Sequence, residues 1–345
     1  MKNQLKKFRV EAGRTQEEVA QAVGVTQPNY YRWEAGQAPI PEGQLNKLAK
    51  VFKTTPDHLL GRHPPIKAAF YDERAPEELQ YYGEVTVHFL GGSEPLLLSI
   101  SEDAHSRLYR DLQRNLKFVA VQSLSNQTVI IRSKAISDLY FSSEAYDDFG
   151  PHEYREIYLK QYKRSLQLPD PRDWDIIESL CHDVGIEDFD ETDIQRIEKI
   201  LEPTTDEEFE QLVLEGKIKA EDVEAAKANE AARLKQIYEL ATTIVCQFST
   251  GPTRKITGAE SEAIYTAFWE YLLEFEEFED QMICLPAEGY HRSVFINTDG
   301  FDYISIPTHK WEEGRIEADA ESIDAFSPDT DKPKRRRRLK AVEGS

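Results

Sequence analysis

The segment from Thr15 to Gly36, TQEEVAQAVGVTQPNYYRWEAG, constrains the fold of this chain more than any other. Thr15 and Glu18 have the spacing of a capping box, which starts a helix by satisfying its free backbone amides. Gly24 can adopt the left-handed backbone that ends a helix, and Thr26 is placed to cap a second one. The segment therefore predicts two short helices joined by a tight turn. This is the layout of a helix-turn-helix, whose second helix lies in the major groove of DNA.

The second helix is predicted to have two different faces. Tyr30 and Trp33 are three residues apart, so both point toward the core. Gln27, Tyr31 and Arg32 then lie on another face. That polar face is the candidate surface for reading DNA, and an ordinary solvated helix face is the alternative.

The chain from about Leu5 to Gly61 resembles the XRE-type helix-turn-helix family, the family of Cro and the phage repressors. The resemblance covers under a fifth of the 345 residues. It implies an all-α DNA-binding domain of five helices over residues 1–65. Besides the capped helices, the resemblance rests on Phe8-Arg9, Gln16, the ending Trp33-Glu34-x-Gly36, and the later run Leu45, Leu48, Ala49, Phe52, Leu59 and Leu60.

The resemblance also implies roles for individual residues. The family position of Gln16 bonds a phosphate from a helix N-terminus, and the positions of Gln27, Pro28 and Arg32 face base edges. Pro28 departs from the pattern because it removes one base contact. In addition, Arg9 and Glu34 are implied to form a partly buried ion pair that ties the first helix to the third.

Side-chain chemistry favours the same assignments. A glutamine can bond adenine N6 and N7 together, and an arginine can bond guanine O6 and N7, each pair discriminating by about 1–3 kcal/mol. Asn29 and Tyr31 are better suited to phosphate oxygens, which position a protein on the duplex. The predicted DNA-binding residues are therefore Gln16, Thr26, Gln27, Asn29, Tyr31 and Arg32.

Composition and charge limit the rest of the molecule. With 40% hydrophobic residues, the chain can bury a core and form two or three domains. Three scattered cysteines do not suggest a disulfide framework or a zinc finger. Without an apolar signal segment or membrane span, we expect a soluble cytoplasmic protein.

The net charge of −21 is divided unevenly, because residues 1–65 carry +4 and the remainder −25. We therefore expect the basic end to meet DNA while the acidic body stays away from the duplex, leaving the head free.

The pattern after Pro64-Pro65 predicts an α+β body. Residues 80–150 show the order strand, strand, helix and three further strands. A similar order recurs about 165 residues later, over 244–315, with a helix expected from Ala259 to Phe278. In this alignment Val129–Ser133 corresponds to Val294–Thr298, and Ile136–Phe141 to Phe301–Ile306.

The origin of this similarity stays open at the sequence level. A duplication predicts two similar modules that pack within one chain or pair across a dimer. Few identities support it, so chance similarity between two small α+β modules is the alternative. The aromatic residues Tyr140, Phe141, Phe301 and Tyr303 could stack on RNA bases, but core or edge positions explain them more simply.

An acidic segment lies between these modules, and a segment with a basic cluster follows them. Residues 151–243 predict acidic helices that act as a spacer or a dimerisation arm. The run Glu187–Asp193 lacks the glycine and glutamate of a calcium loop, so an acid-rich helix start is favoured and no metal site is predicted. Residues 316–345 are expected to be a disordered tail. Its basic cluster, a candidate auxiliary contact with nucleic acid, is Lys334, Arg335, Arg336, Arg337 and Arg338.

Motifs for catalysis are weak. Cys181 and His182 are adjacent, no HExxH is present, and Gly91-Gly92 lacks the residues of a phosphate loop, so no catalytic residue and no cofactor are predicted. The sequence favours a DNA-binding transcriptional regulator, repressor-like, that binds double-stranded DNA as a homodimer. The body would then associate with itself or sense a small effector. The alternatives are an antitoxin or adaptor whose body grips a partner protein, and an enzyme that uses the head for targeting.

Overall fold

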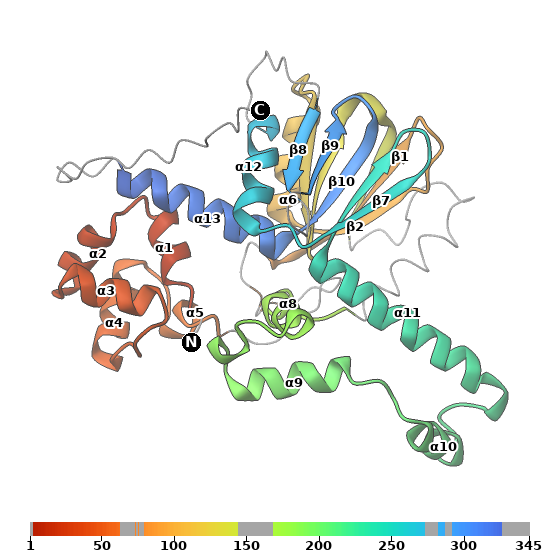
Figure 1. Cartoon of the computed structure of the whole chain (residues 1–345), viewed down its shortest axis with the longest axis horizontal. Helices are drawn as coiled ribbons and strands as arrows, with labels where there is room; N and C mark the ends of the chain where they lie inside the picture. The colour runs from red at the N-terminus through yellow and green to blue at the C-terminus, as the bar shows by residue number, and fades with distance from the viewer. Residues whose placement is uncertain are drawn as a thin grey trace, which may run out of the picture.

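A computed structural model provides the structure of the protein. It describes residues 3–62, 73, 75, 79–143, 168–272, 282–286 and 292–325. In this part of the chain a helical head, an antiparallel sheet and a helical arm can be distinguished (Figure 1). None of the helices described there is long and apolar enough to cross a membrane.

The head contains the five helices expected from the sequence. They are α1 (Leu5–Glu11), α2 (Gln16–Val23), α3 (Gln27–Glu34), α4 (Glu42–Val51) and the single turn α5 (Pro56–Leu59). Their apolar faces enclose one core, in which Leu5, Val19, Tyr30, Leu48 and Leu59 are fully buried. The head thus has its own hydrophobic core.

The body is built on one antiparallel sheet of eight strands in the order β5-β1-β2-β3-β4-β10-β6-β7. A separate two-stranded sheet pairs β8 with β9. The first half supplies β1 (Tyr81–Phe89), β2 (Leu96–Ser101), α6 (Glu102–Leu112), β3 (Phe118–Ser123), β4 (Gln127–Arg132) and β5 (Ile136–Ser143). The second supplies β6 (Thr243–Phe248), β7 (Thr253–Thr257), α12 (Ser261–Leu272), β8 (Met282–Pro286), β9 (Ser293–Asn297) and β10 (Phe301–Pro307).

The two halves meet in the middle of the sheet, where β4 pairs with β10. The separate modules expected from the sequence are therefore joined by a continuous hydrogen-bonded ladder. The sequence alignment assigned no residues to β8, the first of the three strands expected after the helix, and α12 ends at Leu272 within the described residues. The rest of the predicted helix, 273–278, lies outside them.

The helices of the two halves lie on opposite faces of the sheet. Successive strand residues point to opposite faces. In β3, Val119 packs in the core beneath α6, whereas its neighbour Phe118 packs in the core beneath α12. The reason is the direction of the strands. β1 and β6 are the first strands of their halves, and the antiparallel pairings between them make them run in opposite directions. The strand order across the sheet is the same in both halves, so the reversed direction turns the second helix to the other face.

The segment between the halves forms the helical arm. It consists of α8 (Trp174–His182), α9 (Glu191–Leu201), α10 (Asp206–Leu214) and the long α11 (Val223–Thr242). Its core surrounds Trp174, Ile177 and Ile237, and α11 leads into β6. The acidic run before α9 forms a helix start, as the sequence indicates, with Asp190 accepting a hydrogen bond from the Thr192 amide.

The last described helix corrects a boundary from the sequence analysis. Residues 316–325 were expected to belong to a disordered tail, but they form the second half of α13 (Thr308–Ala325). This helix is ordered because Trp311 and Gly314 are buried on it, Gly314 close to Ser261 of the neighbouring α12. Arg315 adds ion pairs to Glu312 and Asp319 along the helix. The basic cluster 334–338 lies outside the described residues.

Candidate nucleic-acid interface

The helix α3 exposes the side chains that the sequence predicts as candidates for contact with DNA. Gln27, Asn29, Tyr31 and Arg32 are all exposed. Tyr30 and Trp33, on the other side of the helix, are buried in the head core. The alternation follows from the helical period, which places residues three apart on one side. The polar face of α3 is therefore open to solvent and can approach a duplex.

The turn before α3 fixes its direction. Thr15 and Glu18 form both hydrogen bonds of the capping box at the start of α2. Gly24 ends α2 with φ +77°, in the left-handed region that glycine adopts most easily. Thr26 is the N-cap of α3 with an extended backbone and an exposed side chain, and its hydroxyl makes no capping bond within the described head. Its predicted contribution is thus reduced to a backbone cap and an exposed hydroxyl.

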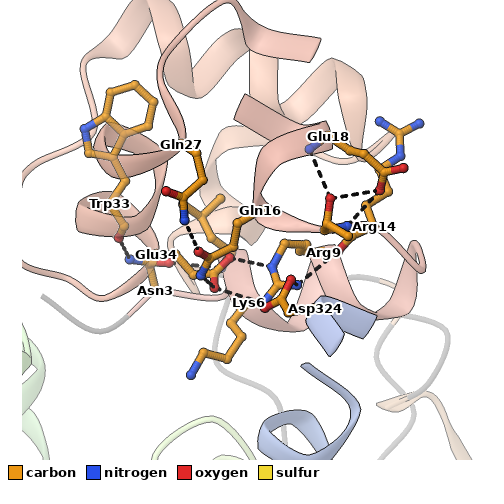
Figure 2. A network of polar contacts seen from close by, with 12 residues as sticks. Asn3, Lys6, Arg9, Arg14, Gln16, Glu18, Gln27, Trp33, Glu34 and Asp324 are labelled. Carbon is orange, nitrogen blue, oxygen red and sulfur yellow. Dashed lines mark hydrogen bonds and ion pairs between the residues drawn. The ribbon is translucent and has the colours of Figure 1, made fainter. Parts of the chain in front are cut away.

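A chain of hydrogen bonds connects the two predicted glutamines (Figure 2). The Gln27 amide Nε2 donates to Gln16 Oε1 at 2.8 Å. In turn, Gln16 Nε2 donates to Glu34 Oε1 at 2.8 Å. The glutamine at the start of α2 is therefore held against the end of α3, and it holds the glutamine at the start of α3.

These hydrogen bonds leave unused the amide hydrogens and the oxygen that contacts with DNA require. An amide nitrogen carries two hydrogens and its oxygen has two lone pairs. Gln27 uses one hydrogen on Gln16, so one hydrogen and its oxygen remain for the N7 and N6 groups of an adenine. Gln16 likewise keeps one amide hydrogen for a phosphate oxygen. The internal chain thus orients both side chains without consuming their capacity to bind.

The predicted ion pair between Arg9 and Glu34 is present and anchors this chain. Arg9 Nε donates to Glu34 Oε2 at 2.8 Å and Arg9 Nη2 to Glu34 Oε1 at 3.1 Å. Both side chains are 1% exposed. Burial alone would lower the pKa of Arg9, but its bonds and charge interaction with Glu34 outweigh burial and raise it. Burial, and next the negative charge of Glu34, raises the pKa of the adjacent Tyr30 hydroxyl, so the arginine stays charged and the tyrosine neutral.

The structure adds a contact that sequence reasoning missed, between the head and α13. Arg9 Nη1 lies 3.4 Å from Asp324 Oδ1, and Lys6 pairs with Glu317. The head is therefore docked on the body. This corrects the expectation that the head is free of the body. The only sequence signal for this contact is charge, because the basic head faces a helix with six acidic and two basic side chains.

Metal ligands, reactive thiols and exposed aromatic residues were also sought in the described part of the chain. No set of three His, Cys, Asp or Glu side chains is placed there to hold a metal ion. Burial raises the pKa of Cys181 to about 11 and that of Cys246 to about 12, so both thiols are protonated near neutral pH. Among the aromatic residues considered for RNA stacking, Phe301 belongs to the core beneath α12, and Tyr303 and Phe141 are partly buried against the core beneath α6.

Comparison with known proteins identifies the head. Residues 5–59 match the model of the helix-turn-helix family. This confirms the resemblance to the XRE type found in the sequence, for that part of the chain. No curated protein and no solved structure matches the chain.

Proposed function

We propose that the protein is a sequence-specific transcriptional regulator, acting as a repressor, that reads the major groove with α3. The helix-turn-helix match supports a DNA-binding regulator of the XRE type. The observation that carries the finer proposal is the exposed face of α3, on which Gln27 is already oriented by Gln16 and Glu34. On this view the protein acts in the cytoplasm, where it has access to DNA.

The polar residues of the head are proposed to have two roles, contact with bases and contact with phosphates. Gln27 is proposed to read an adenine and Arg32 a guanine, since each can make two hydrogen bonds to one base edge. Gln16, Asn29 and Tyr31 are proposed to bind phosphates, and Thr26 to add a further contact with the DNA backbone. Such contacts fix the register of the protein on the duplex without reading its sequence.

We further propose that the active form is a homodimer. One head covers one half-site, so a palindrome with half-sites about 34 Å apart, or a multiple of this, is the geometric expectation. Footprinting on a selected site and sedimentation of the complex test this. A single unpaired half-site bound by a monomer would refute the dimer.

The body supports a proposed duplication. Each half has two strands, a helix and three strands, and two pairs of residues that align between the halves are buried in both. Ile131 and Ile296 belong to the cores beneath α6 and α12 respectively, as do Ile100 and Ile256. We propose that the two halves are a pseudo-symmetric pair within one chain, related by an axis that crosses the strands, and the opposed strand directions support this.

An adaptor or antitoxin function is the second candidate. It is favoured by the apolar side chains that the arm exposes, since Leu214 is 82% and Val184 68% exposed. Isolated apolar residues on a surface are common, so this support is weaker than that for DNA regulation. A stoichiometric partner that co-purifies through these two residues, and is lost when both are changed to Ser, would favour the adaptor.

The decisive experiment is selection of bound DNA from a random pool by the full chain, followed by affinity measurements on selected and scrambled duplexes. Arg32→Ala should relax preference at one base pair by about 1–3 kcal/mol. Gln16→Ala should weaken all sequences about equally. Gln21→Ala is a matched control, because Gln21 is an exposed glutamine of the same helix as Gln16. Absence of any sequence preference, even at low salt, would contradict the proposal.

A further inference from the structure

The last described helix, α13, connects the sheet to the DNA-binding head. Its first half packs beside α12, and its second half lies along α1 (Figure 1). Two ion pairs join it to α1, Glu317 with Lys6 and Asp324 with Arg9. Six of its side chains are acidic and two are basic. An acidic helix is therefore attached directly to the basic head.

This attachment reaches the residues proposed to bind DNA. Asp324 contacts Arg9, Arg9 holds Glu34, and Glu34 accepts a hydrogen bond from Gln16 (Figure 2). Only the Arg9 and Glu34 side chains stand between the Asp324 carboxylate and the glutamine expected to meet a phosphate.

Docking of α13 can affect DNA binding through geometry or through charge. The geometric effect is small, because Arg9 is already fixed by two bonds to Glu34 and one to the Arg14 carbonyl. The charge effect is larger. Docking pairs Lys6 with Glu317 and brings the Asp324 carboxylate to Arg9, two side chains from Gln16, which is expected to receive a phosphate. The attraction between cations and phosphates supplies much of the affinity for DNA.

The junction can also open at low cost. Lys6 is 34% exposed, Glu317 46% and Asp324 42%. Ion pairs between side chains this exposed contribute about 0–1 kcal/mol each and weaken as salt rises. Arg9 is only 1% exposed, but it keeps both of its bonds to Glu34 when Asp324 leaves.

We propose that α13 is an inhibitory brace on the head. Docked, it weakens binding to DNA of any sequence, and released, it allows tighter binding. The proposal rests on the DNA-binding function proposed above. Its effect is electrostatic, so it differs from base reading in being independent of sequence and sensitive to salt.

The test uses the full chain and a double variant, Glu317→Gln with Asp324→Asn. Affinity for the selected duplex and for a scrambled duplex is measured by fluorescence anisotropy at about 50 mM and 300 mM salt. We expect the double variant to bind both duplexes about fivefold more tightly at the lower salt, with most of the gain lost at the higher salt. Glu321→Gln is the control for the loss of one such charge at an exposed position of the same helix that makes neither contact with α1, and its gain should stay below about twofold.

Small-angle scattering of the same proteins without DNA reports docking independently. The double variant should show a larger radius of gyration than the wild type and the Glu321→Gln control. Weaker DNA binding by the double variant, or an equal gain for Glu321→Gln, would overturn the brace. So would unchanged affinity in a variant that scattering shows to be undocked. Failure of every protein, wild type included, to bind either duplex would instead refute the proposed function.

Discussion

Individual side chains show which parts of the site a sequence can predict. Gln27 and Arg32 were identifiable as candidates because the pattern within one helix fixes which face each residue occupies, and Gln16 because the family resemblance implies its role. The bond from Gln27 to Gln16 was not, although both residues were selected, because it depends on the angle between two helices. Asp324 was missed altogether, since 315 positions separate it from Arg9. Patterns within one helix carry no information about such a contact.

A second buried network, between the arm and α13, leads to a prediction about pH. Glu178 accepts from His309 Nε2 at 2.8 Å and pairs with Lys310. Burial alone would raise the pKa of Glu178, but these two partners lower it to about 2, from a usual value of 4.5. A lowered pKa stabilises the fold above the unfolded-state value, and this contribution is lost as the pH falls toward the folded-state value.

We therefore expect Glu178→Gln to destabilise the protein by about 2–3 kcal/mol at pH 7. The difference from the wild type should shrink as the pH is lowered from about 5 toward 2. Urea denaturation across this range measures it. A difference that stays constant with pH would show that the Glu178 carboxylate is not held ionised by its partners.

At the scale of helices and strands, the sequence predicted local elements better than their assembly. Most strands of the body were recognisable from alternating apolar residues. No residues were assigned to β8, because its exposed residues Met282 and Cys284 are themselves apolar and its sequence shows no alternation. The pairing of β4 with β10 joins segments about 170 positions apart, and strand periodicity does not specify a distant partner. The second half of α13 was assigned to a disordered tail because its sequence is rich in acidic residues. Ala320 is buried there, but one alanine among acidic residues does not predict packing.

Close packing between α12 and α13 gives a prediction at this scale. A Cβ added at Gly314 would lie 2.1 Å from the Ser261 carbonyl oxygen and 2.8 Å from Tyr265 Cβ. Gly314→Ala should therefore cost about 1–3 kcal/mol, the usual effect of overpacking, although alanine is the better helix former. Gly43→Ala is the control. A Cβ at that position of α4 meets no atom within 4 Å, so this variant should be neutral or slightly more stable. Equal denaturation midpoints for both variants would contradict the packing argument.

At the scale of the whole molecule, stability is distributed unevenly. The central strand β4 is paired on both sides and buries Thr128, Val129, Ile130 and Ile131. In the arm, α10 buries only Phe209 among its residues, and α11 buries only Ile237 and Ala241, both near its C-terminal end. The outer part of the arm thus has little apolar burial to offset the entropy of ordering.

Hydrogen exchange of the full chain should reveal this difference. Amides of α10 and of the first half of α11 are expected to exchange orders of magnitude faster than those of β4, because opening the outer arm exposes little apolar surface. The ion pair between Lys227 and Asp206 joins α10 to α11 in this region, but Asp206 is 83% exposed, so the pair adds little stability. Fast exchange would agree with a spacer, one of the two roles that the sequence left open for this segment. Protection of α10 as strong as that of β4 would contradict the spacer role and indicate that the arm is covered in solution, as a dimerisation arm would be.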